Sequence, residues 1–426
     1  MEKYTYKDSG IEWLSEIPTH WKVKRLSNIC DFVRGNSGFG KNDLLTEGKY
    51  VALQYGKTYN VQEVNEQFKF YVNDNFYKNS QIVNYGDVIF VSTSETIEDL
   101  GHSVFYNRND IGLIGGEQIV LKPNRNILDS KYLFYSSKVF GKELKKFATG
   151  IKVFRFDTYD LKTIYNPLPP KQEQIAIATY LDEACKRLDR IIAIKEAQID
   201  KLTKNQKTKI IHFLTKGAKI DSKLKNAGIN WMDKMPVHWR RKRLKDIVNL
   251  KSGDTITSTS IGKTGDYPVY GGNGLRGFTN NFTHEGYFPL IGRQGALCGN
   301  INYANDKFFA SEHAVVATPI LKCDVYWIGE LMRLMDLNQY SNAAAQPGLS
   351  VERLKQLYIP LPPIKEQIEI SEVIRKLTEK NFNLKKNLKS QIKTLKAYRK
   401  SLIHECVTGK KQVATIASKK KEKASV

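Results

Sequence analysis

The sequence predicts a mixed α/β protein with an internal pseudo-two-fold repeat, in which two globular units are joined by two long antiparallel coiled-coil-like helices. The chain has 426 residues, which is too long for one ordinary hydrophobic core and indicates at least two domains. One unusual phrase occurs twice, as PLPPKQEQI at 167–175 and as PLPPIKEQI at 360–368. A long lysine-rich run with leucine and isoleucine at helical spacing follows each copy.

The repeated phrase belongs to a larger duplication. GIEWLSEIPTHWKVKRL at 10–26 recurs as GINWMDKMPVHWRRKRL at 228–244, and a glycine ends each helical run, at Gly217 and at Gly409. The segment between the tryptophan motif and the proline phrase is longer in the first half, whereas the two helical runs match in length to within one residue. Repeats of this size are too long for a solenoid, so the pattern indicates two diverged copies of one unit.

Both middle segments alternate strand-like and helix-like stretches, which is typical of a mixed α/β domain. In the first half we expect strands at 68–72, 86–93 and 115–123, and a helix over 131–147. In the second half we expect strands at 287–292 and 313–319, and a helix over 325–337. Each half therefore predicts a globular unit in front of its long helix.

The long helices are predicted to begin just after the paired prolines, because proline fits the first turn of a helix but not its interior. Glu173 and Glu366 fall in that first turn, where a carboxylate favours the positive end of the helix. Steps of four and three residues in the second run predict a coiled-coil seam with two polar interruptions. The seam positions are Ile370, Ile374, Leu377, Asn381, Leu384, Leu388, Gln391, Leu395, Tyr398 and Leu402. We expect the two helices to pair antiparallel; the alternative is that each helix packs on its own globular unit.

These features divide the chain into five predicted segments. They are a first globular domain at 1–166, a central helix at 167–217, a second globular domain at 218–359, a C-terminal helix at 360–409 and a disordered basic tail at 410–426. The tail is lysine-rich, lacks apolar periodicity and has no counterpart in the first half, which is why we expect it to be disordered.

The charge balance predicts a polyanionic partner, most often a nucleic acid. Lys and Arg number 67 against 44 Asp and Glu, which gives a formal net charge of +23. The alternative is a basic protein without such a partner.

Cysteine usage and the absence of targeting patterns predict a cytoplasmic protein. The five cysteines are scattered and form no CxxC pair, which argues against a disulfide framework or structural zinc. The N-terminus lacks a basic-then-apolar signal pattern, and no apolar run is long enough to span a bilayer.

Three stretches partly match nucleotide-binding or methyltransferase motifs, but each lacks residues or a structural element that its motif requires. GNGLRG at 272–277 has the spacing of a dinucleotide fingerprint, but turn-rich residues follow it where a helix is required. The GKT at 262–264 lacks the earlier glycine of a phosphate loop, since Thr257 stands there. NPLPP at 166–170 has a leucine between its prolines and no aromatic residue after them, unlike the Asn-Pro-Pro motif of amino-methyltransferases. We therefore expect no catalytic residue and no bound metal in this chain.

The candidate functional residues are polar or basic and lie in loops, several of them flanked by glycine. Arg293 follows an expected strand, and a guanidinium there can take guanine O6 and N7 or clamp a phosphate. Amide side chains such as Gln294 can read adenine edges. The full set of candidate DNA contacts is Gln54, Lys57, Thr58, Ser92, Thr93, Ser94, Lys152, Arg155, Asn273, Arg276, Arg293, Gln294, Gln346 and Ser350.

Both PLPPxxEQ phrases, both tryptophan motifs, GYFPLIGRQGALCGN at 286–300 and both glycine stops together resemble the DNA-specificity (S) subunit of type I restriction-modification systems. The resemblance covers residues 10–410. It implies two target-recognition domains, each reading half of an asymmetric DNA site with a non-specific spacer. The first half departs from the second, because VSTSE stands where the second half has GRQG.

The resemblance also implies partners and cofactors. The paired helices would separate the recognition domains and dock two modification (methyltransferase) subunits, and restriction (endonuclease/translocase) subunits would complete the complex. S-adenosylmethionine, ATP and Mg would be bound by those partners and not by this chain, which would itself be non-catalytic. Two other functions stay open: a DNA methyltransferase or nuclease acting by itself, and a non-specific basic DNA-binding protein.

Overall fold

The computed structural model describes residues 3–219, 222–295, 297–341 and 348–413. The chain divides into two compact units. Unit 1 comprises residues 1–194 and 391–426, and unit 2 comprises residues 195–390. Most of the predicted tail, 414–426, lies outside the described residues, as does the candidate residue Gln346. Among the helices that the structure describes, none is long and apolar enough to cross a membrane.

The core of unit 1 is built on two sheets. The first has the strand order β4-β13-β9-β11-β6, with bounds Cys30–Arg34, Gln118–Pro123, Val88–Val91, Ser103–Tyr106 and Glu63–Val64. The second has the order β7-β5-β12-β8, with bounds Tyr71–Val72, Tyr50–Leu53, Gly112–Ile114 and Ile82–Val83. The two faces of β9 are both buried: Val88 and Phe90 pack toward the helices, while Ile89 packs toward the second sheet. This explains why β9 reads as an unbroken apolar run.

Unit 2 repeats this topology, except that its first sheet has no counterpart of β6. Its first sheet has the order β19-β26-β23-β24, with bounds Val248–Ser252, Ala314–Pro319, Phe288–Gly292 and Ile301–Ala304. Its second sheet has the order β21-β20-β25-β22, with bounds Gly274–Thr279, Tyr267–Gly271, Lys307–Ala310 and His284–Glu285. In both units the second sheet contains one parallel pair, β5 with β12 and β20 with β25, between antiparallel neighbours. The predicted duplication of a mixed α/β unit is thus confirmed.

Shorter elements complete each unit in the same order. The flanking strands of unit 1 are β1 (Tyr6–Asp8), β2 (Glu16–Pro18), β3 (Lys22–Arg25) and β15 (Tyr165–Leu168), matched in unit 2 by β16 (Leu224–Ile229), β17 (Met232–Pro236), β18 (Arg240–Arg243) and β27 (Tyr358–Leu361). The helices α2 (Ser130–Phe140) and α3 (Thr158–Thr163) match α5 (Val325–Leu334) and α6 (Val351–Lys355). The helix predicted over 131–147 thus ends at Phe140, and 3-10 geometry follows at 143–147. The strand predicted at 68–72 is a strand only at Tyr71–Val72, because Phe68 leaves the sheet to pack between the layers.

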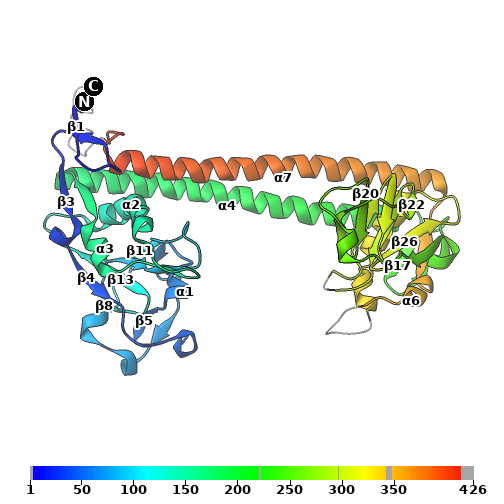
Figure 1. Cartoon of the computed structure of the whole chain (residues 1–426), viewed down its shortest axis with the longest axis horizontal. Helices are drawn as coiled ribbons and strands as arrows, with labels where there is room; N and C mark the ends of the chain where they lie inside the picture. The colour runs from blue at the N-terminus through cyan, green and yellow to red at the C-terminus, as the bar shows by residue number, and fades with distance from the viewer. Residues whose placement is uncertain (1–2, 220–221, 296, 342–347, 414–426) are drawn as a thin grey trace. The chain divides into compact units, whose positions relative to one another are not determined.

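The long helices α4 (Lys171–Lys216) and α7 (Ile364–Val407) each contribute to both units (Figure 1). In unit 1, Arg399 of α7 bonds Asp189 of α4 at 3.2 Å, and Leu181 shares a core with Leu402. In unit 2, Gln206 of α4 lies 3.4 Å from Thr378 and 3.1 Å from Lys385 of α7, while Leu214 shares a core with Ile370 and Ile374. Numbers rise along one helix as they fall along the other, so the pairing within each unit is antiparallel, as predicted.

The predicted seam is correct at every seventh residue from Ile374 to Leu402, and it is displaced by one residue at the alternate positions after Asn381. Ile370, Ile374 and Asn381 are buried, but Leu384 and Tyr398 are exposed, at 43% and 51%. Ile392 is buried where the prediction placed Gln391. The seven-residue spacing itself holds, since Leu388 and Leu395 are half-buried and Leu402 is buried. The prediction chose the apolar neighbours Leu384 and Tyr398 over Lys385 and Arg399, whose polar ends contact Gln206 and Asp189 of α4.

The repeated Glu-Gln dipeptide explains the repeated proline phrase. Glu173 accepts a hydrogen bond from His20 Nε2 at 3.0 Å, and Glu366 accepts one from His238 Nε2 at 2.8 Å. Glu366 also accepts from Trp239 Nε1 at 3.0 Å. The first turn of each long helix is therefore bound to the tryptophan motif of the same unit.

The glutamine of the dipeptide binds the start of the next helix. Gln174 accepts from the backbone N–H of Asp129 at 2.7 Å, and Gln367 accepts in the same way from Asp324 at 2.9 Å. Both aspartates are N-caps, of α2 and α5 respectively. The glutamine amides also donate to the carbonyls of the proline phrases, at Pro169 and Pro362. One carbonyl of the proline phrase and the N–H at one helix start are thus satisfied by one side chain in each unit.

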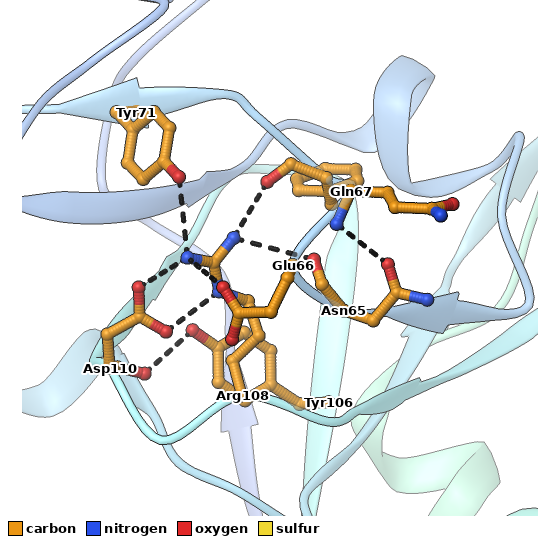
Figure 2. Close-up of polar contacts among 8 residues, drawn as sticks. Asn65, Glu66, Gln67, Tyr71, Tyr106, Arg108 and Asp110 are labelled. Carbon is orange, nitrogen blue, oxygen red and sulfur yellow. Dashed lines mark hydrogen bonds and ion pairs between the residues drawn. The ribbon is translucent and has the colours of Figure 1, made fainter.

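A buried arginine organises one side of unit 1 (Figure 2). Arg108, with its side chain 5% exposed, binds Asp110 through two hydrogen bonds of 2.6 and 2.7 Å and lies 3.3 Å from Glu66. It also donates to the carbonyl of Phe68 at 2.9 Å and to the hydroxyl of Tyr71 at 3.3 Å. Because its donors are occupied inside the protein, this arginine holds the chain between β6 and β7 in place.

Candidate nucleic-acid interface

In unit 2, four connections converge at one end of the sheets. They are the β20–β21 turn, the loop after β23, the β25–β26 turn and the segment before α6. Together they form a cavity of about 530 Å³, here called the unit 2 cavity. Its lining residues are Gly272, Asn273, Arg276, Gln294, Gly295, His313 and Gly348.

Glycines allow these connections to touch through their backbones. A Cβ on Gly272 would lie 3.2 Å from the carbonyl oxygen of Gln294 and 3.3 Å from that of His313. A Cβ on Gly292 would lie 2.2 Å from the carbonyl oxygen of Gly272, which no real side chain tolerates. The N–H of Arg293 donates to the His313 carbonyl at 2.9 Å, which fixes the loop after β23. The GNGLRG stretch is therefore a hairpin turn with no helix after it.

The structure brings three predicted contacts of unit 2 together and separates the others. Asn273, Arg276 and Gln294 line the same cavity, and all three are exposed. Arg293 is half-buried and donates to Ser252 Oγ at 3.2 Å, away from the cavity lining. Ser350 caps α6 by accepting from the backbone N–H of Arg353 at 3.4 Å.

Unit 1 has a cavity at the equivalent place. Four connections form it: α1 (Tyr55–Thr58), which follows β5; β10 (Thr93–Ser94), which follows β9; the turn that precedes β13; and the strand β14 (Phe154–Arg155). Its volume is about 510 Å³, and we call it the unit 1 cavity. Its lining residues are Tyr55, Gly56, Tyr59, Thr93, Ser94, Glu95, Thr96, Asp99, Glu117, Val153 and Arg155.

Three of the predicted contacts in unit 1 line this cavity. Thr93 and Ser94 belong to β10, which pairs with β14 so that Thr93 lies opposite Arg155. The pairing of Gln294 with Gly348 in unit 2 occupies the same place. The VSTSE and GRQG loops therefore occupy equivalent positions despite their different sequences.

The remaining predicted residues of unit 1 lie around the cavity. Gln54 caps α1 by accepting from the N–H of Lys57 at 3.1 Å. The Lys57 ammonium lies 4.6 Å from the centre of the Phe70 ring. Thr58 and Ser92 are buried, and Thr58 donates to the Gln54 carbonyl at 3.0 Å. Lys152 is exposed on the segment before β14.

The two cavities differ in charge. Glu95, Asp99 and Glu117 place three carboxylates around the unit 1 cavity, where Arg155 is 3.9 Å from Glu117. The unit 2 cavity instead has Arg276 and His313. Burial raises the pKa of Tyr59 beside the unit 1 cavity, so its hydroxyl remains a neutral donor at neutral pH.

Sequence reasoning missed several lining residues, although the duplication contains the signal for two of them. Glu117 and His313 each stand just before the equivalent strands β13 and β26, so aligning the halves at those strands would have found both. Tyr55, Tyr59 and Glu95 have no counterpart in the second half, because the connections there differ in length.

Within the described ranges, no group of three His, Cys, Asp or Glu side chains is placed to hold a metal ion. The five cysteines, Cys30, Cys185, Cys298, Cys323 and Cys406, are free, and all but Cys323 are buried. Both cavities are instead lined by groups that donate or accept hydrogen bonds, together with charged groups. Side chains of these kinds bind the edges of bases.

Comparison with known proteins gives curated relatives of one kind. The chain is 39% identical over 144 residues to the type I restriction enzyme EcoprrI specificity subunit of Escherichia coli, covering 33% of this chain and 36% of the relative. It is 25% identical to the MjaVIII specificity subunit of Methanocaldococcus jannaschii, covering 58% of this chain and 54% of the relative. The putative MjaX specificity subunit of that organism is 24% identical and matches along 94% of this chain and 96% of its own length. The chain thus spans about a third to a half of the first two relatives.

Two solved structures share the fold, and a family model covers most of the chain. A chain from work on complex assembly and conformational transition of the type I R-M system has a TM-score of 0.71 at 16% identity, covering 92% of this chain and 98% of that chain. The HsdS subunit from Thermoanaerobacter tengcongensis has a TM-score of 0.53 at 16% identity over the same shares. The family model for the type I restriction modification DNA specificity domain matches residues 18–204 and again 236–394. With both copies of that domain present, the chain belongs to the type I restriction-modification DNA specificity family.

Proposed function

We propose that this chain is the sequence-specificity subunit of a type I restriction-modification complex and reads a bipartite asymmetric DNA site. Each unit reads one half-site, and the bases between the half-sites form a non-specific spacer. One observation carries the proposal: the two units have one topology and a cavity in the same place, but line it with different polar groups. Two units that share a scaffold but line their cavities with different side chains are suited to bind two different DNA half-sites.

The chemistry of each lining suits base edges. In unit 2, the Arg276 guanidinium matches guanine O6 and N7, while Asn273 and Gln294 match adenine N6 and N7. In unit 1, the carboxylates of Glu95 and Glu117 can accept from cytosine N4 or adenine N6. The formal net charge of +23 supplies the attraction to the phosphate backbone that both readers require.

The chain's role in the complex is to recognise DNA and to assemble the other subunits, without chemistry of its own. Two modification subunits dock on the chain, and restriction subunits join them; S-adenosylmethionine, ATP and Mg are bound by these partners. Exposed apolar side chains on the long helices support docking: Ile194 of α4 is 52% exposed, and Phe382 of α7 is 65% exposed.

A competition experiment tests the proposal against the other two functions. The full chain is assembled with its modification subunits, the methylated site is mapped, and that duplex is competed with random duplex. A specific reader should prefer its own site by about 10³-fold or more. Equal affinity for both duplexes would favour a general DNA-binding protein, and methylation by the purified chain alone would favour an enzyme.

A further inference from the structure

A second cavity of unit 1 lies next to the unit 1 cavity, and Asp99 lines both. Its volume is about 330 Å³, and it runs between the segment 98–103, the end of α2 with the turn after it, and the last part of α7. Its basic lining residues are Lys138, Lys142, Lys145, Arg399 and Lys400. Glu98 and Asp99 are the carboxylates in the same lining. We call this cavity the basic groove.

Three of the five cations of the groove are poorly neutralised, whereas Arg399 forms an ion pair with Asp189 of α4 at 3.2 Å. Among the described residues, no carboxylate lies within ion-pair distance of the ammonium groups of Lys138, Lys142 or Lys400. The Lys138 ammonium donates to Gln62 Oε1 at 2.7 Å and to the carbonyl of Ser103, which are neutral acceptors. Burial, and then the positive charge of Arg399, lower the pKa of Lys138 to about 7. An anion in the groove would offset this unfavourable charge.

The floor of the groove lets a ligand come close. Gly101 has a φ of +88°, and a Cβ there would lie 2.4 Å from the carbonyl oxygen of Gly141. Both glycines line the groove, so its floor at this point is bare backbone. Long basic side chains stand around this floor, which is a suitable arrangement for a phosphate group.

Unit 2 has an equivalent groove with a different charge. Arg333 follows the N-cap Asp324 by as many residues as Lys138 follows Asp129. Lys207 precedes Gly217 by as many residues as Arg399 precedes Gly409, and both Arg333 and Lys207 line the unit 2 groove. Arg333 bonds Glu330 at 3.2 Å and is thereby neutralised. Thr208 and Leu337 stand at the positions of Lys400 and Lys142. The two exposed lysines of the unit 1 groove, Lys142 and Lys400, therefore have no basic counterpart in unit 2.

We propose that the basic groove of unit 1 binds a phosphate of the DNA backbone, next to the base pair that the unit 1 cavity reads. The inference rests on the proposed function and adds a residue-level role to it. Phosphate contacts fix the register of a protein on the duplex, whereas base contacts give its sequence preference. Lys142 and Lys400 are positioning residues in this account: they hold the half-site over the cavity without reading it.

The test uses a double variant of the full chain, Lys142→Gln with Lys400→Gln. Both side chains are exposed, so the fold should survive. Affinity for the mapped site and for random duplex should fall by a similar factor. The slope of log K against log salt should become shallower by about one for each phosphate that the variant no longer neutralises. The arginine pair, Lys142→Arg with Lys400→Arg, should restore both quantities.

The matched control removes two charges from the equivalent part of unit 2, Lys204→Gln with Lys207→Gln, which are also exposed. Its salt slope should change clearly less than that of the unit 1 variant. Equal changes in the two variants would show a general effect of net charge and overturn the inference.

Three other results would overturn it as well. An unchanged slope in the unit 1 variant means that the groove does not touch DNA. If inorganic phosphate raises the melting temperature of the wild type but not of the variant, while the slope is unchanged, the groove takes a free anion. If the variant loses modification subunits at unchanged slope, the groove is a protein-docking face. If the wild type does not prefer its mapped site over random duplex, the proposed function is wrong, whatever the salt slopes of the variants.

Discussion

At the scale of single residues, the structure separates arginines that can read DNA from those that cannot. Arg293 is the most conspicuous arginine of the sequence, yet it bonds Ser252 and does not line the cavity. Arg276 is exposed and lies beside Asn273 and Gln294 in the cavity lining. Sequence reasoning singled out Arg293 and gave Arg276 only as one candidate among the rest, because the direction of a side chain at a turn depends on the other connections that pack against it.

Arg276→Ala should weaken binding to the mapped site by about 1–3 kcal/mol and relax the preference at one position of one half-site. The reason is that the variant cannot form the bidentate pair with a base, and no neighbour can replace it. Binding titrations on duplexes substituted at each position measure this. Lys263→Ala is the matched control, since Lys263 is exposed in the same unit and does not line the cavity. A uniform loss across all sequences would assign Arg276 to a phosphate instead.

The buried Arg108 gives a prediction about stability rather than recognition. Arg108→Met leaves the carbonyls of Phe68 and Asn65 without this donor and should lower the free energy of unfolding of unit 1 by about 3 kcal/mol. Chemical denaturation of the full chain measures the loss. Lys49→Met is the control, because its ion pair with Asp74 is exposed and screened by solvent and should contribute little to stability. Equal losses in both variants would contradict the structural role of Arg108.

His102 makes unit 1 sensitive to acid. Burial lowers its pKa from 6.5 to about 4, and its Nε2 lies 2.9 Å from the Val61 carbonyl oxygen. The folded state therefore favours the neutral ring, so stability is complete above pH 6.5 and falls as the pH drops from 6.5 toward 4. His102→Gln keeps an N–H donor but does not titrate. Melting temperatures across this range should fall more steeply for the wild type than for the variant; parallel curves would refute the assignment.

At the scale of elements, the repeated motifs were predictable and the recognition loops were not. The Glu-Gln dipeptides bind the same partners in both units, so their bonds require the same residue types twice, and the repetition is visible in sequence. The cavity linings can differ between the units, because the equivalent strands fix where the loops begin whatever residues the loops contain. These strands are β5 and β9 in unit 1 and β20 and β23 in unit 2. The seam prediction was displaced by one residue at Leu384, Gln391 and Tyr398, because the contact positions Lys385 and Arg399 are not apolar and were passed over for apolar neighbours.

The matched lengths of α4 and α7 predict that helix length determines the spacer. Inserting seven residues, about two turns, into both helices keeps the apolar face in register and adds about 10 Å. The preferred spacer should then grow by about three base pairs, with both half-sites unchanged. Methylation of a library with variable spacers measures this. Activity that persists with the original spacer would show that helix length does not set it.

At the scale of the whole molecule, one duplicated scaffold carries two recognition cavities of opposite charge character. Asp99 and Glu117 line one cavity, and Arg276 and His313 line the other, on sheets that share their strand order apart from β6, which has no counterpart in unit 2. The duplication predicted two units and the basic charge a polyanionic partner, and the family resemblance implied that each unit reads half of a DNA site. Which side chains line each cavity could not be predicted, because the cavities form where four connections distant in sequence meet.

The most direct test of this account is methylation mapping of a complex whose specificity chain has the connections around one recognition cavity replaced. The unit 2 connections at 272–276 and 293–299 are replaced by those of a relative, and the methylated sites are read by single-molecule sequencing. The account predicts that one half-site changes while the other half-site and the spacer stay the same. A change in both half-sites, or in neither while methylation persists, would contradict the claim that each unit reads its own half of the site.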